Sequence, residues 1–185
     1  MDRRELLTGA GALFSAHVIS TSALAEAKSG ATTSPATEAD VRFMQLAIDQ
    51  ARLGDYPFGA AIVRDGHVLT LAHNRTRSNG DPTAHAEMMA IRIFLQEHRP
   101  EDLRTTTLYA SGEPCPMCMG AIIWSGIKRL VFAASIAELA TSIGQIDITA
   151  QQIADATPFT SIDITGGVLA GDAMRLFQAT QPSPQ

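Results

Sequence analysis

Apolar residues recur along most of the chain at the spacings of helices and strands. In the stretch 38–53, Val41, Met44, Ala47 and Ile48 follow three- and four-residue intervals and predict one face of a helix. The same pattern predicts further helices over 84–98, 116–125, 136–141, 149–154 and 172–178. β-Rich runs predict strands over 58–64, 67–72, 105–110, 128–133 and 161–165, the first two joined as a hairpin at Asp65-Gly66.

The order of these elements predicts an α/β fold. A helix precedes the hairpin, and helices and strands then alternate, so helices are expected to cover a central sheet. The hairpin brings an antiparallel pair into a sheet whose other connections pass through helices, which makes the sheet mixed. A chain of 185 residues, 45% of them hydrophobic and 18% charged, is expected to bury one such core as a single domain.

The first 25 residues have the composition of an export signal. Arg3 and Arg4 precede a weakly apolar stretch rich in small residues, and Ala23-Leu24-Ala25 fits a small-x-small cleavage pattern. Paired arginines before such a stretch resemble a twin-arginine signal, which predicts a periplasmic protein without a stable membrane span after signal removal. The alternative is a cytoplasmic protein in which this stretch is a buried or membrane-anchoring helix.

Composition changes again after the signal. Residues 26–37 are rich in small and polar residues and predict a linker, which places the folded domain at 38–180 and a short tail at 181–185. The net charge of −5 disfavours nucleic acid as a partner, because proteins that hold a polyanion usually present a basic face. A small-molecule substrate is therefore expected.

Two short motifs carry candidate metal chemistry. His85-Ala86-Glu87 begins one predicted helix and Cys115-Pro116-Met117-Cys118 begins another, 30 positions further on. This separation leaves room for one helix and one strand, so the two helix N-termini can meet at one edge of the sheet. His85, Cys115 and Cys118 offer the three protein ligands that a catalytic zinc takes, with a fourth position left for water. Glu87 is then placed to carry protons without ligating the metal.

Each motif alone has other interpretations. A lone C-x-x-C is also typical of redox sites, and three zinc ligands are also compatible with a structural metal. The chain has only two cysteines, which excludes a disulfide scaffold and leaves both thiols for one metal. Together, with Pro114 before Cys115, the two motifs match the zinc nucleobase deaminase signature H-x-E…P-C-x-x-C.

At these residues the chain resembles the cytidine deaminase-like superfamily, over roughly residues 40–177. Asp81-Pro82-Thr83-Ala84-His85-Ala86-Glu87 resembles both bacterial guanine deaminases and tRNA adenosine deaminases. Glu113-Pro114-Cys115-Pro116-Met117-Cys118, followed by Gly120-Ala121-Ile122-Ile123-Trp124, is more similar to guanine deaminases. The resemblance implies a three-layer α/β/α fold with a mixed central sheet of about five strands, a bound Zn²⁺ and a homodimer.

The resemblance also implies substrate-binding residues, most of which have an ordinary structural alternative. Asn74 is expected to hydrogen-bond the base, or else to cap a turn. Phe58 is expected to place a ring near the base, or to pack in the core, and Ala84 to lie beside the base. Trp124 faces the base in guanine deaminases but serves packing equally well. Asp147 ends Gly144-Gln145-Ile146-Asp147, which aligns with a G-F-D-D-like segment; it is a second candidate acid, or a solvated loop residue.

These residues favour hydrolytic deamination of a purine base, with guanine converted to xanthine and ammonia. Gln145 and Ile146 depart from the guanine deaminase pattern. That departure keeps open another base or nucleoside, such as cytosine, adenine or cytidine. A tRNA adenosine deaminase is disfavoured by the export signal and the acidic charge. A non-catalytic zinc-binding module is disfavoured by Glu87, which a structural site does not need.

Overall fold

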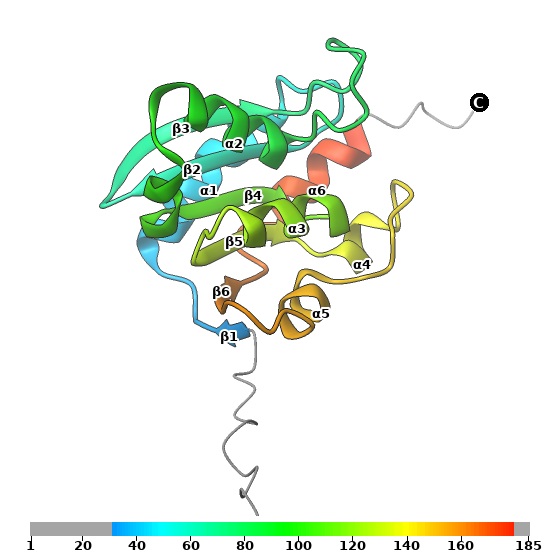
Figure 1. Ribbon diagram of the computed structural model, residues 1–185. Coiled ribbons are helices and arrows are strands. Elements are labelled where there is room, and N and C mark those ends of the chain that lie inside the picture. The colour runs from blue at the N-terminus through cyan, green and yellow to red at the C-terminus, as the bar shows by residue number, and fades with distance from the viewer. Residues whose placement is uncertain (1–30, 180–185) are drawn as a thin grey trace, which may run out of the picture.

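The computed structural model describes residues 31–179, in which helices and strands alternate as Figure 1 shows. The strands are β1 (Ala31–Thr33), β2 (Gly59–Arg64), β3 (His67–His73), β4 (Thr107–Gly112), β5 (Arg129–Ala134) and β6 (Ile162–Thr165). The helices are α1 (Glu38–Ala51), α2 (Ala86–Glu97), the 3₁₀ helix η1 (Pro100–Thr105), α3 (Pro116–Trp124), α4 (Ile136–Leu139), α5 (Ala150–Asp155) and α6 (Ala170–Ala179).

The strands form one mixed sheet in the order β1-β6-β5-β4-β2-β3. β4, β5 and β6 run parallel, whereas β2 is antiparallel to both β3 and β4. The hairpin turns at Asp65 and Gly66, whose positive φ angles of 51° and 77° are those that a tight two-residue turn requires. The predicted mixed sheet of about five strands is therefore confirmed.

The sheet also contains a sixth strand that the sequence pattern did not predict. β1 pairs in parallel with β6, and its three residues fall inside the segment 26–37 that was expected to be a linker. The strand is too short to show a period of its own, and its partner lies about 130 positions away in the sequence. The regular structure therefore begins before Thr37.

Alternation along the strands divides the buried side chains between the two faces of the sheet. In β4, Leu108 and Ala110 pack with side chains of α2, α3 and α5, whereas Tyr109 packs with α1 and α6 on the other face. β5 repeats the pattern with Leu130 and Val131. The result is the expected three-layer α/β/α arrangement, with α2 and α3 in front of the sheet in Figure 1.

A buried ion pair fixes α1 to the sheet. Thr37 caps this helix in a reciprocal capping box with Asp40, as its position before the apolar run predicts. The Asp40 carboxylate is 1% exposed and also accepts hydrogen bonds from Tyr109 Oη at 2.8 Å and from Arg129 Nη1 at 2.6 Å. Burial alone would raise the pKa of Asp40, but the hydrogen bonds from Arg129 and Thr37 hold it well below its usual range.

We expect Asp40→Ala to lower the free energy of unfolding by about 3 kcal/mol at pH 7, because it leaves Arg129 without its buried partner. The pKa of Asp40 is depressed on folding, so its contribution is fully present above the unfolded value near about 3.9 and is lost as the pH falls below it. The gap between the two proteins should therefore narrow below about pH 4. Urea denaturation at several pH values measures this difference in the free energy of unfolding. Asp49→Ala, at an exposed position, provides the control and should lower the free energy of unfolding by less than about 0.5 kcal/mol. A constant gap down to pH 2 would contradict the assignment.

The predicted twin-arginine signal at 1–25 and the tail at 181–185 lie outside the described residues. Among residues 31–179, no helix combines the length and the apolar character needed to cross a membrane.

Candidate metal centre and active site

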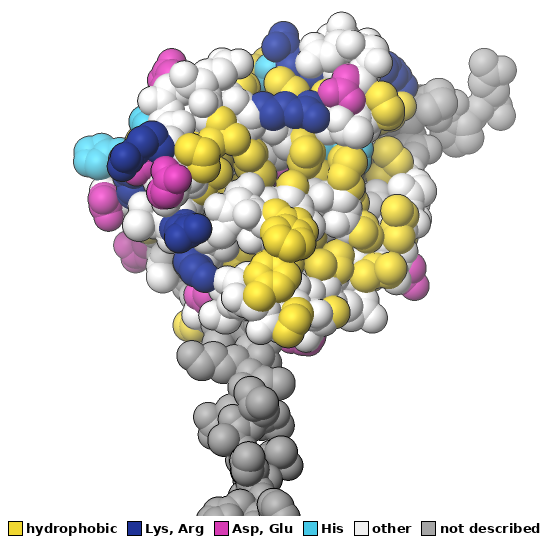
Figure 2. All heavy atoms as spheres, viewed as in Figure 1, with side chains coloured by type: hydrophobic (Ala, Val, Ile, Leu, Met, Phe, Trp, Pro, Cys, Tyr) yellow, Lys and Arg dark blue, Asp and Glu magenta, His cyan; other side chains and the backbone are white. Residues whose placement is uncertain are grey.

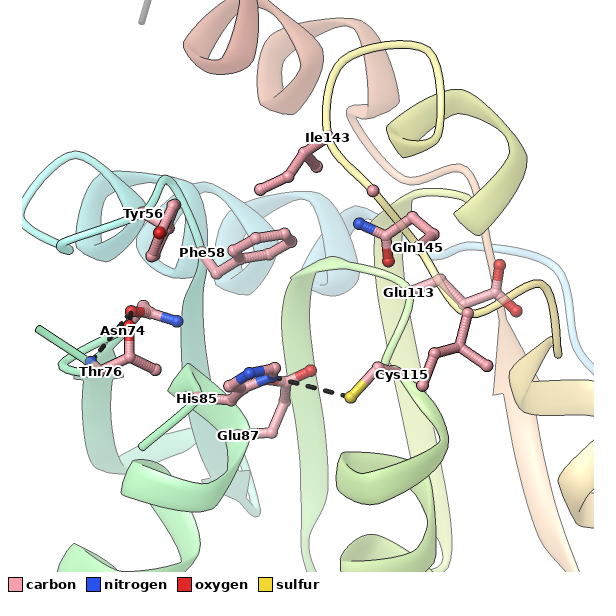
Figure 3. Close-up of a pocket in the computed structure, with 12 residues that line it drawn as sticks. Tyr56, Phe58, Asn74, Thr76, His85, Glu87, Glu113, Cys115, Ile143 and Gln145 are labelled. Atoms are coloured by element: carbon pink, nitrogen blue, oxygen red, sulfur yellow. Dashed lines mark hydrogen bonds between the residues drawn. The ribbon is translucent and has the colours of Figure 1, made fainter. Parts of the chain in front are cut away.

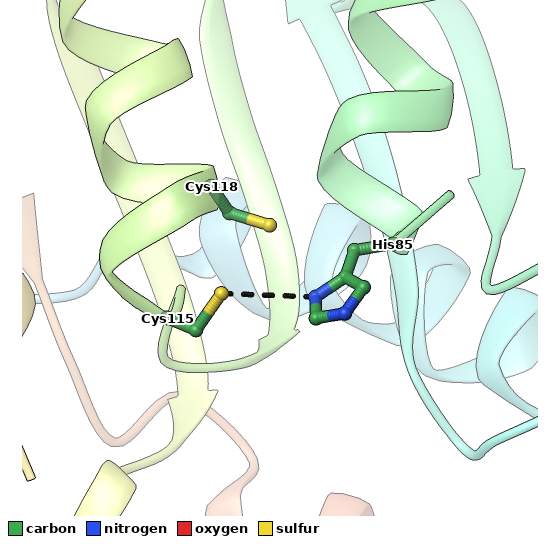
Figure 4. Close-up of side chains that lie close together, drawn as sticks. All are labelled: His85, Cys115 and Cys118. Carbon is green, nitrogen blue, oxygen red and sulfur yellow. Dashed lines mark hydrogen bonds between the residues drawn. The ribbon is translucent and has the colours of Figure 1, made fainter. Parts of the chain in front are cut away.

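Two helix N-termini meet where β4 ends, and both carry candidate metal ligands. His85 is the N-cap residue of α2, and Cys115 is the N-cap residue of α3, with Cys118 one turn further along. Figure 4 shows the imidazole facing both sulfur atoms across the gap between the helices. The sequence therefore brings the three predicted ligands to one place, although they come from two motifs separated by β4.

The donor set fits zinc. The candidate ligand atoms of His85, Cys115 and Cys118 all lie within 4.8 Å of one another. His85 Nδ1 is 3.7 Å from Cys115 Sγ, close to the separation of about 3.6 Å expected of two ligands with zinc–nitrogen and zinc–sulfur bonds at a tetrahedral angle. One nitrogen and two sulfur donors are also ligands that zinc prefers. The three residues can therefore hold one Zn²⁺ and leave a position open toward the adjoining pocket.

The two thiols differ in acidity because they share one hydrogen bond. Cys118 donates to Cys115, which together with His85 lowers the pKa of Cys115 to about 4. The same contact with Cys115, followed by burial, raises the pKa of Cys118. Zinc binds thiolates, so the binding of a metal at these two residues is accompanied by the loss of their thiol protons.

Glu87 lies in the first turn of α2, beside the ligand cluster but outside it. Its side chain is only 6% exposed and lines the same pocket as His85 and Cys115. Burial raises the pKa of Glu87 to about 7, and the neighbouring Cys115 charge adds to the rise. A carboxyl group with this pKa exchanges protons readily near neutral pH.

A cavity of about 380 Å³ opens above this cluster. Its size falls in the range of small-molecule sites. The cavity is lined by Tyr56, Phe58, Asn74, Thr76, His85, Glu87, Glu113, Cys115, Ile143, Gly144, Gln145 and Ile146, most of which Figure 3 labels. The walls come from the segments before β2 and after β3, from the starts of α2 and α3, and from the loop between α4 and α5.

Asn74 caps a turn and also lines the cavity. Its side chain is 3% exposed, and its Oδ1 accepts hydrogen bonds from the Thr76 backbone N–H at 3.2 Å and from Thr76 Oγ1 at 2.9 Å. Because a backbone N–H can only donate, this contact fixes which end of the amide is the oxygen. The amide nitrogen is then directed toward the pocket, as Figure 3 shows, where it can donate to an acceptor on a ligand.

Phe58 likewise lies in the pocket wall and in the core. Its ring packs edge-on against Phe177, with centroids 5.0 Å apart, and contacts both apolar layers of the fold. Its other side lines the cavity. The two interpretations of Phe58 are therefore compatible.

Three residues expected at the substrate do not line this cavity. Ala84 is fully buried, and its backbone is engaged with Asp81 and Arg75. Trp124 ends α3, about 13 Å along the helix axis from Cys115, and is 78% exposed. This distance keeps it away from the cavity. Asp147 is exposed to solvent in the loop before α5.

Sequence reasoning also missed pocket residues. Gln145, noted only as a departure from a family pattern, points into the cavity with its amide, whereas Asp147 two positions later does not line it. The motif around Cys115 includes Glu113 but does not indicate that its side chain lines the cavity. Tyr56 lies two positions before Phe58, and Ile143 has no local motif that would have singled it out.

Comparisons with known proteins agree with this arrangement. Residues 37–134 match the family model described as the cytidine and deoxycytidylate deaminase zinc-binding region. This range contains all three candidate ligands and Glu87. The match covers more than half of the chain and ends with β5.

Individual relatives differ in the substrates that their names give. The guanine deaminase of Bacillus subtilis is 46% identical over 78 residues, which cover 42% of this chain and 50% of that protein. A protein of Schizosaccharomyces pombe named "Probable cytosine deaminase" is 44% identical over 104 residues, which cover 54% of this chain and 62% of the relative. The chain thus spans between half and two thirds of the length of these relatives.

A solved structure from a study of tRNA:A34 deaminases, which edit adenosine to inosine at the tRNA wobble position, has a similar fold. It superposes with a TM-score of 0.61 at 31% identity, covering 73% of this chain and 98% of that chain. The similarity of fold therefore extends over about three quarters of this chain.

Proposed function

This chain belongs to the family described as the cytidine and deoxycytidylate deaminase zinc-binding region, and on that premise we propose that it deaminates a free purine base, converting guanine to xanthine. The observation that carries the proposal is the convergence of a metal-ligand cluster, a buried carboxyl group and an amide donor on one cavity of about 380 Å³. His85, Cys115 and Cys118 hold the metal, and Glu87 and Asn74 face the substrate.

The chemistry needs water to add to the ring carbon that bears the amino group, and ammonia to leave. When bound, zinc lowers the pKa of a water molecule so that it can attack at neutral pH. Glu87 would accept one proton from the attacking water and pass it to the adjacent ring nitrogen. It would then take the remaining proton of the added hydroxyl group and deliver it to the amino group, so that the C–N bond breaks, ammonia leaves and the carbonyl forms. Its buried position in the wall of the cavity, beside the ligand cluster, places the carboxyl group for both transfers. Asn74 donates a hydrogen bond to the base and holds it against Phe58.

Two features support guanine over the rival substrates. The motif from Glu113 to Trp124 resembles that of guanine deaminases, and the guanine deaminase of Bacillus subtilis is 46% identical over 78 residues. The amides of Asn74 and Gln145 offer hydrogen-bond donors and acceptors to a base with several polar edges. Cytosine, adenine, cytidine and the adenosine of a tRNA remain the alternatives that the experiment must separate.

The proposal is tested by measuring ammonia release from the zinc-loaded protein across guanine, adenine, cytosine, their nucleosides and a tRNA anticodon stem-loop. We expect guanine to give a kcat/KM at least about tenfold above any other substrate, with xanthine identified as the product. Preferential turnover of another compound in the panel would replace guanine by that substrate. No turnover of any compound would overturn the enzymatic proposal in favour of a zinc-binding module.

We further propose that the protein forms a homodimer through an exposed apolar face. Trp124 and Phe159 stack with ring centroids 4.8 Å apart, although they are 78% and 57% exposed. Figure 2 shows hydrophobic side chains gathered on the face that carries α3. Large exposed apolar patches of this kind are typical of protein interfaces.

Sedimentation velocity is expected to give the mass of two chains for the unmodified protein and of one chain for Trp124→Glu. A charge at the centre of an apolar interface is costly to bury, whereas it is tolerated on a solvated surface. Val41→Glu, at an exposed position on α1, controls for the added charge. A monomeric wild-type protein, or a dimeric Trp124→Glu, would contradict this interface.

We also propose that residues 1–25 direct export by the twin-arginine route, on the strength of Arg3, Arg4 and the small-residue stretch that follows. The expected result is a mature periplasmic protein that begins near Glu26. Replacing both Arg3 and Arg4 by lysine should prevent export of the precursor. Cytoplasmic protein that retains Met1 would overturn this localisation.

A further inference from the structure

We propose that Glu113 is a positioning residue that clamps both ends of the loop over the active-site cavity and thereby sets how tightly the base is bound. Glu113 follows β4 and precedes Cys115 by two positions. It is 7% exposed and lines the cavity. The effect on binding of the base rests on the proposed function, whereas the attachment of the loop by Glu113 does not.

The carboxylate of Glu113 makes two hydrogen bonds to segments distant in the sequence. Its Oε2 accepts from the backbone N–H of Ile136 at 2.8 Å, and its Oε1 accepts from the backbone N–H of Ala150 at 2.8 Å. Ile136 is the first residue of α4, and Ala150 is the first residue of α5. One side chain therefore holds the starts of two helices that are 14 positions apart.

The segment between these two anchors forms the cavity wall opposite α2. After α4 ends at Leu139, the chain has no helix or strand until Ala150. Ile143, Gly144, Gln145 and Ile146 of this loop line the cavity, and Figure 3 shows Gln145 beside Glu113 with its amide toward the site. The segment 136–150, which consists of α4 and this loop and reaches the start of α5, is thus attached at both ends to the carboxylate of a single residue.

Glu113 also connects this loop to the metal-binding turn. Its own backbone N–H donates to the Ala134 carbonyl at 2.7 Å, which joins the ends of β4 and β5 just before α4. Among the ion pairs of the described residues, none involves Glu113, so backbone N–H groups rather than a basic side chain partner its carboxylate. Such a contact specifies backbone position rather than charge balance.

Glu113→Gln separates this role from general folding. Glutamine keeps one acceptor oxygen but presents an NH₂ group to the other backbone N–H, so one end of the loop is released. We expect the KM for the base to rise roughly tenfold, with kcat changed less than about threefold and zinc content unchanged. Glu138→Gln is the matched control: Glu138 also accepts a backbone N–H at the start of α4, but it is exposed and does not line the cavity. Its KM should stay within about twofold of the wild-type value.

An unchanged KM in zinc-loaded Glu113→Gln, or a loss of kcat without a change in KM, would overturn the proposal. Hydrogen exchange of the wild-type protein, read amide by amide, tests the clamp even if the variant does not fold or no substrate is found. The amides of Ile136 and Ala150 should be protected far more than those of residues 144–147. If the amides of Ile136 and Ala150 exchanged as fast as those of residues 144–147, the clamp would be rejected. Failure of the proposed function, in contrast, would show only as absent turnover.

Discussion

Replacing Glu87 by glutamine is expected to abolish deamination while zinc stays bound. The glutamine side chain has the shape of the original but cannot accept and return a proton, so kcat should fall by about 10³-fold. Glu87 lies outside the group of atoms that can ligate the metal, so the variant keeps all three candidate ligands and is expected to retain zinc.

The measurement pairs turnover of guanine with zinc content determined on the same preparation. Glu97→Gln makes the same chemical change on the same helix at an exposed position, and should leave both quantities unaltered. A Glu87→Gln protein with kcat within tenfold of the wild-type value would remove Glu87 from the proton-transfer role. A dead variant without zinc would assign it to metal binding instead.

The fold and the ligand cluster could be predicted because their signals are local. Helix periodicity, the Asp65-Gly66 turn and the Thr37 cap are each contained in a few neighbouring residues, and the structure confirms the elements they predict. His85 and Cys115 each begin a helix, so the alternation of strands and helices sufficed to bring them together.

The rest of the site depends on contacts that no local pattern records. Glu113 acts on backbone groups 23 and 37 positions away, and the loop it holds has no periodicity that would show which side chain faces inward. For that reason the resemblance to a G-F-D-D-like segment predicts a role for Asp147, whereas Gln145 lines the cavity. Trp124 was placed by resemblance, but the length of α3 carries it away from the metal ligands.

Replacing Cys118 by alanine is expected to remove zinc and activity together. Cys118 is fully buried and supplies one of three candidate ligands, so its loss should weaken zinc binding roughly 10²- to 10³-fold. The purified variant should carry much less than one zinc per chain, and its residual activity should fall in proportion. Because bound zinc stabilises the folded state, its thermal midpoint should also lie below that of the zinc-loaded wild-type protein.

Chelation and re-addition of zinc separate metal loss from misfolding. Wild-type protein stripped by a chelator should regain activity with stoichiometric zinc, whereas Cys118→Ala should not. Met117→Ala changes the exposed residue between the two cysteines and should behave as the wild type does. A Cys118→Ala protein that binds one zinc per chain with full activity would exclude Cys118 from the ligand set. Inactive Glu87→Gln with zinc and inactive Cys118→Ala without it would together show that the proton carrier and the metal ligands are different residues.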